Sequence, residues 1–255
     1  MRVLSLGAGV QSSGIALMME AGELPKADVV MFADTGAEPQ AVYHYLEYLK
    51  AVLTMPLLVV MQGEGLRKQI EAACRGEVKR ASSLPLFTAN GGRIIRQCTW
   101  DFKVMPIRRE LKLHTKKATM IRGISFDERQ RAKPSDVQWI KHEHPLVDLK
   151  IDRHSIARWI VANGHPLPPR SACCECPNRC STEWKKMRDL SPLDFEEACR
   201  IDELMRDSLP GMKEPVFIHR QCVPLREADL DKGIDPDQLS LGGEGWADCE
   251  GLCGV

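Results

Sequence analysis

The chain has 255 residues, of which 44% are hydrophobic and 27% charged, and its 35 Lys and Arg are balanced by 35 Asp and Glu. This length is enough for one α/β domain with a smaller additional region, and for a hydrophobic core that is stable without disulfides or a structural metal. No stretch is long and apolar enough for a membrane span, and Met1 leads almost directly into a predicted strand without a cationic leader, so we expect a cytoplasmic protein with no membrane partner. In that compartment, ten cysteines indicate metal ligands or redox thiols rather than a disulfide framework.

The balanced charge is unevenly distributed along the chain. Between Arg93 and Lys141 there are 13 Lys and Arg against 5 Asp and Glu, a local excess of +8. From Glu227 to Val255 there are 8 acidic residues against one lysine, a local excess of −7. The basic middle indicates either a polyanionic ligand or a solvated face that the acidic C-terminal segment neutralises.

The first eighteen residues predict a strand, an anion-binding loop and a helix. A short apolar run through Leu6 enters a turn of small residues, and an apolar segment, residues 15–19, follows it. The turn is Gly7-Ala8-Gly9-Val10-Gln11-Ser12-Ser13. Its small residues allow a close backbone approach and positive φ, while Ser12 and Ser13 offer hydroxyls and N–H groups where the helix dipole favours a phosphate. Neither G-x-x-x-x-G-K-[ST] nor a complete G-x-G-x-x-G is present, so the turn alone does not distinguish a phosphate loop from an ordinary tight turn.

The segments that follow alternate between strand and helix. A buried type of strand, residues 29–33, leads into Asp34, Thr35 and Gly36. The next predicted elements are a helix over 39–50 with Val42, Tyr45, Leu46 and Leu49 in the core, a strand over 57–61 covered on both faces, a helix over 65–75, and a strand over 119–123. This alternation predicts an α/β fold with a doubly wound, mainly parallel sheet that binds ligands at the carboxyl ends of its strands.

Two polar segments in the basic middle are candidate parts of a site. Residues 76–97 predict a loop, interpreted either as an active-site lid or as a solvated connection. Gly123, at the end of the last predicted strand, is followed by Asp127, Glu128 and Arg129. Carboxylates there suit a magnesium ion beside phosphates, and guanidinium groups neutralise phosphate charge.

The cysteine segment is the second informative stretch. Cys173 and Cys176 form a C-x-x-C turn, and Cys180 begins a predicted helix over 181–190. These thiols suit one metal centre, with a fourth ligand from Cys98, Cys249 or Cys253. All-sulfur ligation fits tetrahedral zinc or a 4Fe-4S cluster equally well by spacing, and a redox dithiol is the competing interpretation.

The loop, residues 29–36, the segment 123–129 and the cysteine segment together resemble the PP-loop ATPases. The resemblance is to the branch that contains phosphoadenylyl-sulfate reductase, DNA-phosphorothioation enzymes and tRNA-thiolation enzymes with an iron–sulfur cluster. The family's S-G-G-x-D-S loop aligns with Gly7–Ser12, so Gln11 stands where the family has aspartate and Gly7 where it has serine. The resemblance implies an adenine nucleotide alpha hydrolase-like nucleotide-binding domain over 1–165 and a cysteine-rich helical C-terminal region over 166–255.

The resemblance also implies a site and an activity. The nucleotide would be held by Gly7, Ala8, Gly9, Gln11, Ser12, Ser13, Asp34, Thr35 and Gly123; Asp127, Glu128, Arg129, Cys249 and Cys253 would act in catalysis; and Cys98, Cys173, Cys176 and Cys180 would be the metal ligands. The expected cofactors are ATP, Mg²⁺ and a 4Fe-4S cluster, with zinc as the alternative to the cluster.

The expected activity is that of an ATP-dependent adenylating sulfurtransferase acting on a nucleotide or nucleic acid. One alternative is a sulfonucleotide reductase whose catalytic cysteine lies near the C-terminus. A second alternative is a non-catalytic nucleic-acid-binding protein that is stabilised by zinc. The replacement of the family's aspartate by Gln11 supports this alternative. Candidate partners are tRNA or DNA, a sulfur donor protein and, as a homodimer, a second copy of the chain.

Overall fold

The computed structural model describes residues 1–79 and 84–231. Among these residues, the main sheet has five parallel strands in the order β3-β2-β1-β5-β6. The strands are β1 Arg2–Leu6, β2 Val29–Asp34, β3 Leu57–Met61, β5 Ala118–Arg122 and β6 Ile140–Glu143. The chain proceeds outward from β1 through β2 to β3, then returns to β5 on the other side of β1. The α/β prediction is therefore confirmed, and the order reverses between β1 and β5.

Helices cover both faces of this sheet because side chains alternate along each strand. Leu4, Leu6 and Phe32 pack with α1 (Val10–Glu20), α2 (Gln40–Val52) and α6 (Arg153–Ala162). Val3 and Met31 point to the opposite face, where they pack with Ile107 of α4 (Met105–His114). Alternate residues of one strand thus serve two cores, which is the doubly wound arrangement.

The third strand departs from the prediction that it is covered on both faces. β3 forms one edge of the sheet, and both Val59 and Met61 are 41% exposed. An apolar run of five residues predicts a strand but carries no information about the position of that strand in the sheet.

Several features of the helices follow from local sequence. In α2, the four residues predicted for the core, Val42, Tyr45, Leu46 and Leu49, are the buried ones. Asp152 caps α6 by accepting a hydrogen bond from the Ser155 N–H at 2.6 Å. Gly14, within α1, lets α6 approach closely, because a Cβ there would lie 2.3 Å from Cγ1 of Ile156.

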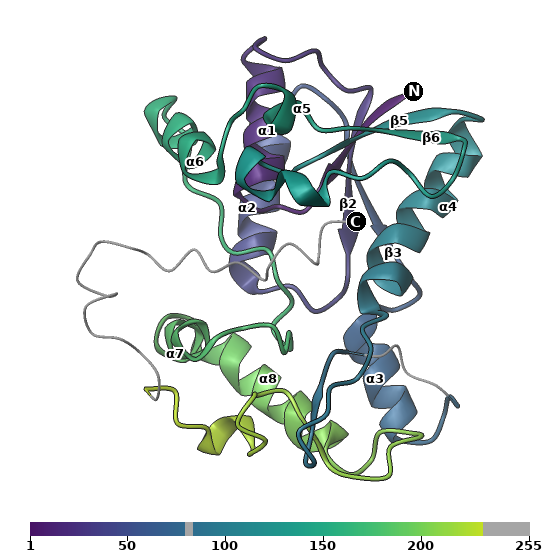
Figure 1. Cartoon of the computed structure of the whole chain (residues 1–255), viewed down its shortest axis with the longest axis vertical. Helices are drawn as coiled ribbons and strands as arrows, with labels where there is room; N and C mark the ends of the chain where they lie inside the picture. The colour runs from purple at the N-terminus through teal and green to yellow at the C-terminus, as the bar shows by residue number, and fades with distance from the viewer. Residues whose placement is uncertain (80–83, 232–255) are drawn as a thin grey trace.

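A second core joins the cysteine region to earlier segments. It contains Trp184 of α7 (Ser181–Leu190), Phe195 and Ile201 of α8 (Pro192–Met205), Leu66 of α3 (Leu66–Cys74) and Phe102 of the π-helical turn η1 (Trp100–Val104). Figure 1 shows α7, α8 and α3 together below the main sheet. Residues from both sides of the predicted boundary at 165 therefore build this core.

Short elements complete the described chain. They are β4 Phe87–Thr88, the 3-10 helix η2 Phe126–Arg131, α5 Pro145–Asp148, β7 Val216–Phe217 and the 3-10 turn η3 Leu225–Glu227. The segment predicted as a loop contains β4, which pairs in antiparallel fashion with β7. Within residues 1–79 and 84–231, no helix combines the length and apolar character needed to cross a membrane.

Candidate functional site

A cavity of about 430 Å³ lies at the carboxyl ends of β1 and β5. Its floor includes Gly7 and Gly9 of the loop after β1, together with Gly123 after β5. The strand order reverses between these two strands, and such reversals leave a crevice where ligands bind in open α/β sheets. The opposite wall comes from the C-terminal region, beginning with residues 167–171.

The loop after β1 has a defined backbone shape. The Gly7 N–H donates to the Ser12 hydroxyl at 3.0 Å, and the Ser13 N–H donates to the Gly9 carbonyl at 3.0 Å to begin α1. Ala8 has φ of 57°, so the alanine, and neither glycine of the loop, adopts the left-handed conformation. That conformation is unfavourable for a residue with a Cβ and must be held by its surroundings.

Gly123 brings the strand β5 against this loop. A Cβ on Gly123 would lie 2.7 Å from the Ser12 nitrogen and 2.9 Å from the Ser12 Cα. Only a glycine leaves room for this approach between two backbones. The two glycine-containing segments that the sequence proposed as one site are therefore in direct contact.

Gln11, which stands where the resembled family has aspartate, connects the loop to η2. Its Nε2 donates to the Ser125 hydroxyl and to the Glu128 carboxylate, each at 3.1 Å. Glu128 also pairs with Arg131. The neutral amide therefore supplies hydrogen-bond donors where an aspartate would bring a second negative charge close to Glu128.

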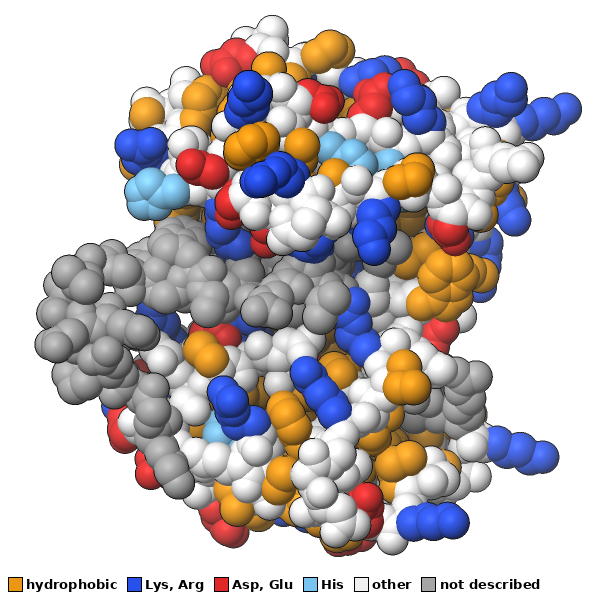
Figure 2. All heavy atoms as spheres, viewed as in Figure 1, with side chains coloured by type: hydrophobic (Ala, Val, Ile, Leu, Met, Phe, Trp, Pro, Cys, Tyr) orange, Lys and Arg blue, Asp and Glu red, His pale blue; other side chains and the backbone are white. Residues whose placement is uncertain are grey.

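Positive side chains outnumber negative ones in the cavity wall. Among the described residues, eight Lys and Arg line it against three carboxylates, those of Glu128, Glu183 and Asp194. The cations are Lys103, Arg108, Arg122, Arg131, Arg153, Arg170, Arg179 and Lys186. Figure 2 shows blue Lys and Arg side chains both above and below the middle of this face. This surplus of positive charge matches a ligand with several negative charges.

Arg122 and His142 mark the β5–β6 end of the cavity. Burial, followed by the neighbouring Arg131 and Arg108, lowers the pKa of Arg122 to about 10. Burial and the same Arg122 and Arg108 lower the pKa of His142 below 6.5. His142 Nδ1 lies 3.1 Å from the Lys133 carbonyl, so Nδ1 donates there and Nε2 is left as an acceptor. Bringing an anion to this end would relieve the repulsion among these groups.

Six of the predicted nucleotide or catalytic residues line the cavity: Gly7, Gly9, Gln11, Ser12, Gly123 and Glu128. Ala8 and Ser13, which belong to the same loop, are fully buried and do not line the cavity. Asp127 accepts a hydrogen bond from the Arg153 N–H at 3.0 Å, and Arg129 stacks on the Phe126 ring at 4.8 Å; both are exposed and neither lines the cavity. Of the two carboxylates proposed for magnesium, Glu128 alone is in place.

Asp34 and Thr35 organise the turn after β2 and do not line the cavity. The Asp34 carboxylate accepts hydrogen bonds from the Gly36 N–H at 2.8 Å and the Tyr43 hydroxyl at 2.9 Å. The Thr35 hydroxyl donates to Glu38 at 3.1 Å. Their role as nucleotide contacts stays a prediction from the sequence.

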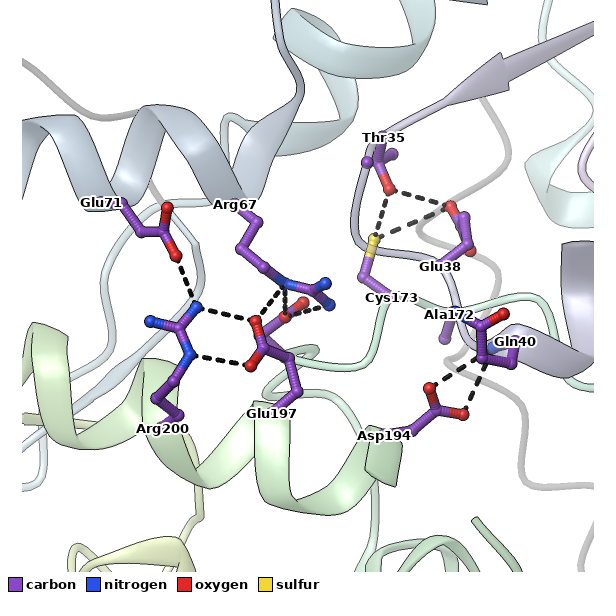
Figure 3. Close-up of polar contacts among 12 residues, drawn as sticks. Thr35, Glu38, Gln40, Arg67, Glu71, Ala172, Cys173, Asp194, Glu197 and Arg200 are labelled. Carbon is purple, nitrogen blue, oxygen red and sulfur yellow. Dashed lines mark hydrogen bonds and ion pairs between the residues drawn. The ribbon is translucent and has the colours of Figure 1, made fainter. Parts of the chain in front are cut away.

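Three of the predicted metal ligands, Cys173, Cys176 and Cys180, contact neighbouring protein groups. Cys173 Sγ lies 3.3 Å from the Thr35 hydroxyl and 3.8 Å from Glu38, as Figure 3 shows. Burial raises the pKa of the Cys173 thiol well above its usual value, with Glu38 adding to the effect. Cys176 packs against Ala172, and the Cys180 N–H donates to Glu183 at the start of α7.

Within the described residues, no three His, Cys, Asp or Glu side chains converge on a point that would hold a metal. The arrangement of Cys98, Cys173, Cys176 and Cys180 therefore does not fit a four-thiolate centre in this conformation. Cys249 and Cys253 lie outside the described residues. The iron–sulfur cluster and its zinc alternative stay predictions.

An ion-pair network holds the cysteine segment against α3 and α8. Glu175 is fully buried and accepts a hydrogen bond from Arg67 Nε at 2.6 Å. Arg67 also pairs with Glu197, which binds Arg200, and Arg200 reaches Glu71 (Figure 3). Burial raises the pKa of Glu175. The network fixes where the cysteine segment enters the cavity wall.

Sequence reasoning missed most of the C-terminal wall. Ser171, Arg170, Arg179 and Lys186 all line the cavity, although they are more than 150 positions from the loop in the sequence. Arg179 donates to the Ala172 and Cys173 carbonyls at 2.7 and 3.1 Å. In the sequence, these wall residues are marked only by their position near the cysteines. That position indicated metal binding and gave no indication that the residues line the cavity.

No protein-family model and no curated protein matches the sequence. Among solved structures, the chain is similar to a phosphoadenylyl-sulfate reductase from Candida auris in a phosphate complex. The two chains are 17% identical, the match covers 66% of this chain and 74% of that one, and the TM-score is 0.47.

Proposed function

We propose that this protein is a nucleotide-dependent enzyme that cleaves ATP between its α- and β-phosphates and adenylates an acceptor for sulfur transfer. The observation that carries the proposal is the cavity in which the Gly7–Ser12 loop faces a surplus of Lys and Arg side chains. Loop N–H groups and the start of α1 suit phosphate oxygens. Guanidinium groups suit them equally, because they donate paired hydrogen bonds.

The proposed step is an in-line displacement at the α-phosphorus. An acceptor oxygen forms a bond to that phosphorus while the bond to the bridging oxygen breaks, and pyrophosphate leaves. The Gly7–Ser12 loop holds the departing pyrophosphate, and Arg122 and Arg131 neutralise the charge that develops on it. A sulfur nucleophile then forms a bond to the carbon that carries the adenylated oxygen. The bond between that carbon and the oxygen breaks, and AMP leaves.

A bound Mg²⁺ would supply further charge neutralisation at the phosphates. Glu128 is the carboxylate that would hold it, and in this structure Glu128 contacts Gln11 and Arg131. The cations on the wall therefore take a larger share of phosphate neutralisation than in a site built around two free carboxylates. A nucleic acid is the acceptor that suits the basic segment 93–141.

The experiment is to incubate the anaerobically purified protein with α-labelled ATP, a pool of RNA or DNA, and sulfide as the sulfur nucleophile. We expect labelled AMP and pyrophosphate in equal amounts, with the label passing transiently to the nucleic acid. Formation of ADP and phosphate, or no nucleotide turnover, would contradict the assignment. An Arg122→Met variant should lose most of the turnover, whereas Arg129→Met, outside the cavity, is the matched control.

A second candidate function is the reduction of a sulfonucleotide. It is favoured by the engagement of Glu128 with Gln11 and Arg131, because binding a sulfonucleotide by cations alone needs no metal. A thiolate, of Cys249 or Cys253, would form a bond to the sulfur while the bond from sulfur to the phosphate oxygen breaks, which releases the nucleotide. A dithiol reductant would then release sulfite. Sulfite formed from adenylyl sulfate or its 3′-phosphate with dithiothreitol, and no pyrophosphate from ATP, would select this function.

A further inference from the structure

Ser171, in the segment that precedes the cysteines, contacts the phosphate loop directly. Its hydroxyl donates to the carbonyl of Gly7, 164 positions away in the sequence. The N–H of Gly7 donates to the Ser12 hydroxyl at 3.0 Å. Gly7 is therefore held at its N–H by the loop itself and at its carbonyl by the C-terminal region.

The hydroxyl of Ser171 decides which way the peptide between Gly7 and Ala8 points. With its carbonyl turned to Ser171, that peptide is prevented from rotating. Ala8, which follows, has φ of 57° and would relax to an extended or helical conformation if the peptide were released. A carbonyl turned into the cavity would repel phosphate oxygens, so its orientation matters for an anion.

The side chain of Ser171 also limits the loop sterically. A Cβ on Gly9 would lie 3.2 Å from the Ser171 Cβ, closer than an ordinary carbon–carbon contact. An alanine at position 9 would therefore push Ser171 and the loop apart by a few tenths of an ångström.

Ser171 is itself firmly placed. Ala172, next in the chain, is fully buried, and its carbonyl accepts a hydrogen bond from Arg179 at 2.7 Å. The Cys174 N–H donates to the Ala37 carbonyl at 2.8 Å, which ties the segment to the turn after β2. Figure 3 shows Ala172 and Cys173 next to that turn.

We propose that Ser171 is a positioning residue: acting through the Gly7 carbonyl, it holds the loop in the shape that binds phosphate groups. This inference rests on the proposed function only in assigning phosphate groups to the loop. It assigns the C-terminal region a part in nucleotide binding that does not depend on any metal.

The first test is hydrogen exchange in the ligand-free protein, which separates positioning from direct ligand contact. In Ser171→Ala, we expect the amides of residues 7–13 to exchange at least about tenfold faster, with the melting temperature unchanged within about 2 °C. Ser171→Thr keeps the hydroxyl and should exchange slowly like the wild type. Ser135→Ala, a loop serine away from the cavity, is the control.

The second test uses inorganic pyrophosphate as the probe, measured by calorimetry. Ser171→Ala should weaken its binding about tenfold, the effect of one lost hydrogen bond of about 1.4 kcal/mol. Gly9→Ala should weaken it further, and Gly9→Ala combined with Ser171→Gly should recover part of the loss because the close contact is removed.

Unchanged exchange of residues 7–13 in Ser171→Ala would overturn the inference, whatever the enzyme turns over. If the wild type does not bind pyrophosphate, the proposed function loses its phosphate site, while the exchange measurement still decides whether Ser171 holds the loop. Faster exchange with unchanged pyrophosphate affinity would also overturn it, because the loop shape would then be irrelevant to phosphate.

Discussion

Gly123→Ala is the substitution that tests most directly whether contact between β5 and the loop defines the site. The new Cβ would lie 2.7 Å from the Ser12 nitrogen and 2.9 Å from the Ser12 Cα. Carbon atoms that are not bonded meet at about 3.5 Å, so the Ser12 backbone must retreat by roughly 0.6 Å. The atoms that must move belong to the backbone, so no rotamer change relieves the contact.

The magnitude follows from that displacement. Overpacking of this kind costs about 1–3 kcal/mol of unfolding free energy, which lowers the melting temperature by roughly 2–10 °C in a chain of this size. Misplacement of reacting groups by about 1 Å can cost about 100-fold in rate. We therefore expect pyrophosphate binding and nucleotide turnover to fall by roughly 10- to 100-fold.

The assay is calorimetric titration with inorganic pyrophosphate alongside thermal unfolding. Gly14→Ala is the matched control, because its Cβ would meet the Ile156 side chain at 2.3 Å, on the face of α1 that packs against α6. It should lower the melting temperature comparably yet keep pyrophosphate affinity within about twofold. If Gly123→Ala binds pyrophosphate as the wild type does, the contact with Ser12 does not set the loop and the reasoning is refuted.

Three further predictions follow from the site and the core. Ser12→Ala removes the acceptor for the Gly7 N–H and should abolish most pyrophosphate release. Ser13→Ala, at a fully buried position, should retain pyrophosphate release, and equal losses in the two variants would contradict the distinction between the two serines. Arg122→Met should raise the melting temperature, because burial disfavours the charge of Arg122, and should weaken pyrophosphate binding about 10- to 100-fold. Arg129→Met should change neither the melting temperature nor the pyrophosphate affinity, and calorimetry measures both quantities. His219 is fully buried, and burial lowers its pKa below 6.5, so the unfolded chain binds the extra proton and stability is lost as pH falls below about 6.5. His219→Gln should flatten the decline in melting temperature between about pH 7 and 5, and an unchanged slope would show that another group is responsible.

The proposed role of Ser171 connects the two regions of the chain. The segment that carries Cys173 and Cys176 also holds the carbonyl of Gly7 through Ser171. A shift of this segment would therefore change the geometry of the loop. Loop exchange measured before and after metal loading would report such a shift.

The sequence by itself determined the elements and their order. Apolar residues at helical spacing placed α2 and its four core positions, and Ser181–Leu190 forms α7 with the predicted bounds. Asp152 marked the start of α6. These features depend on contacts within a few residues of one another, so the local pattern carries them. The glycines at 7, 9 and 123 were likewise recognisable, because close backbone approach restricts the residue type.

Only the tertiary structure decided which of these residues meet. It placed β3 at an edge, turned Asp127 and Arg129 away from the cavity, and brought Arg170, Ser171 and Arg179 to the cavity wall beside the loop. The physical reason is that such contacts join residues distant in the chain, as Ser171 and Gly7 are, 164 positions apart. They are determined by how sheet faces and helices bury their apolar surface, and no local spacing in the chain records that choice.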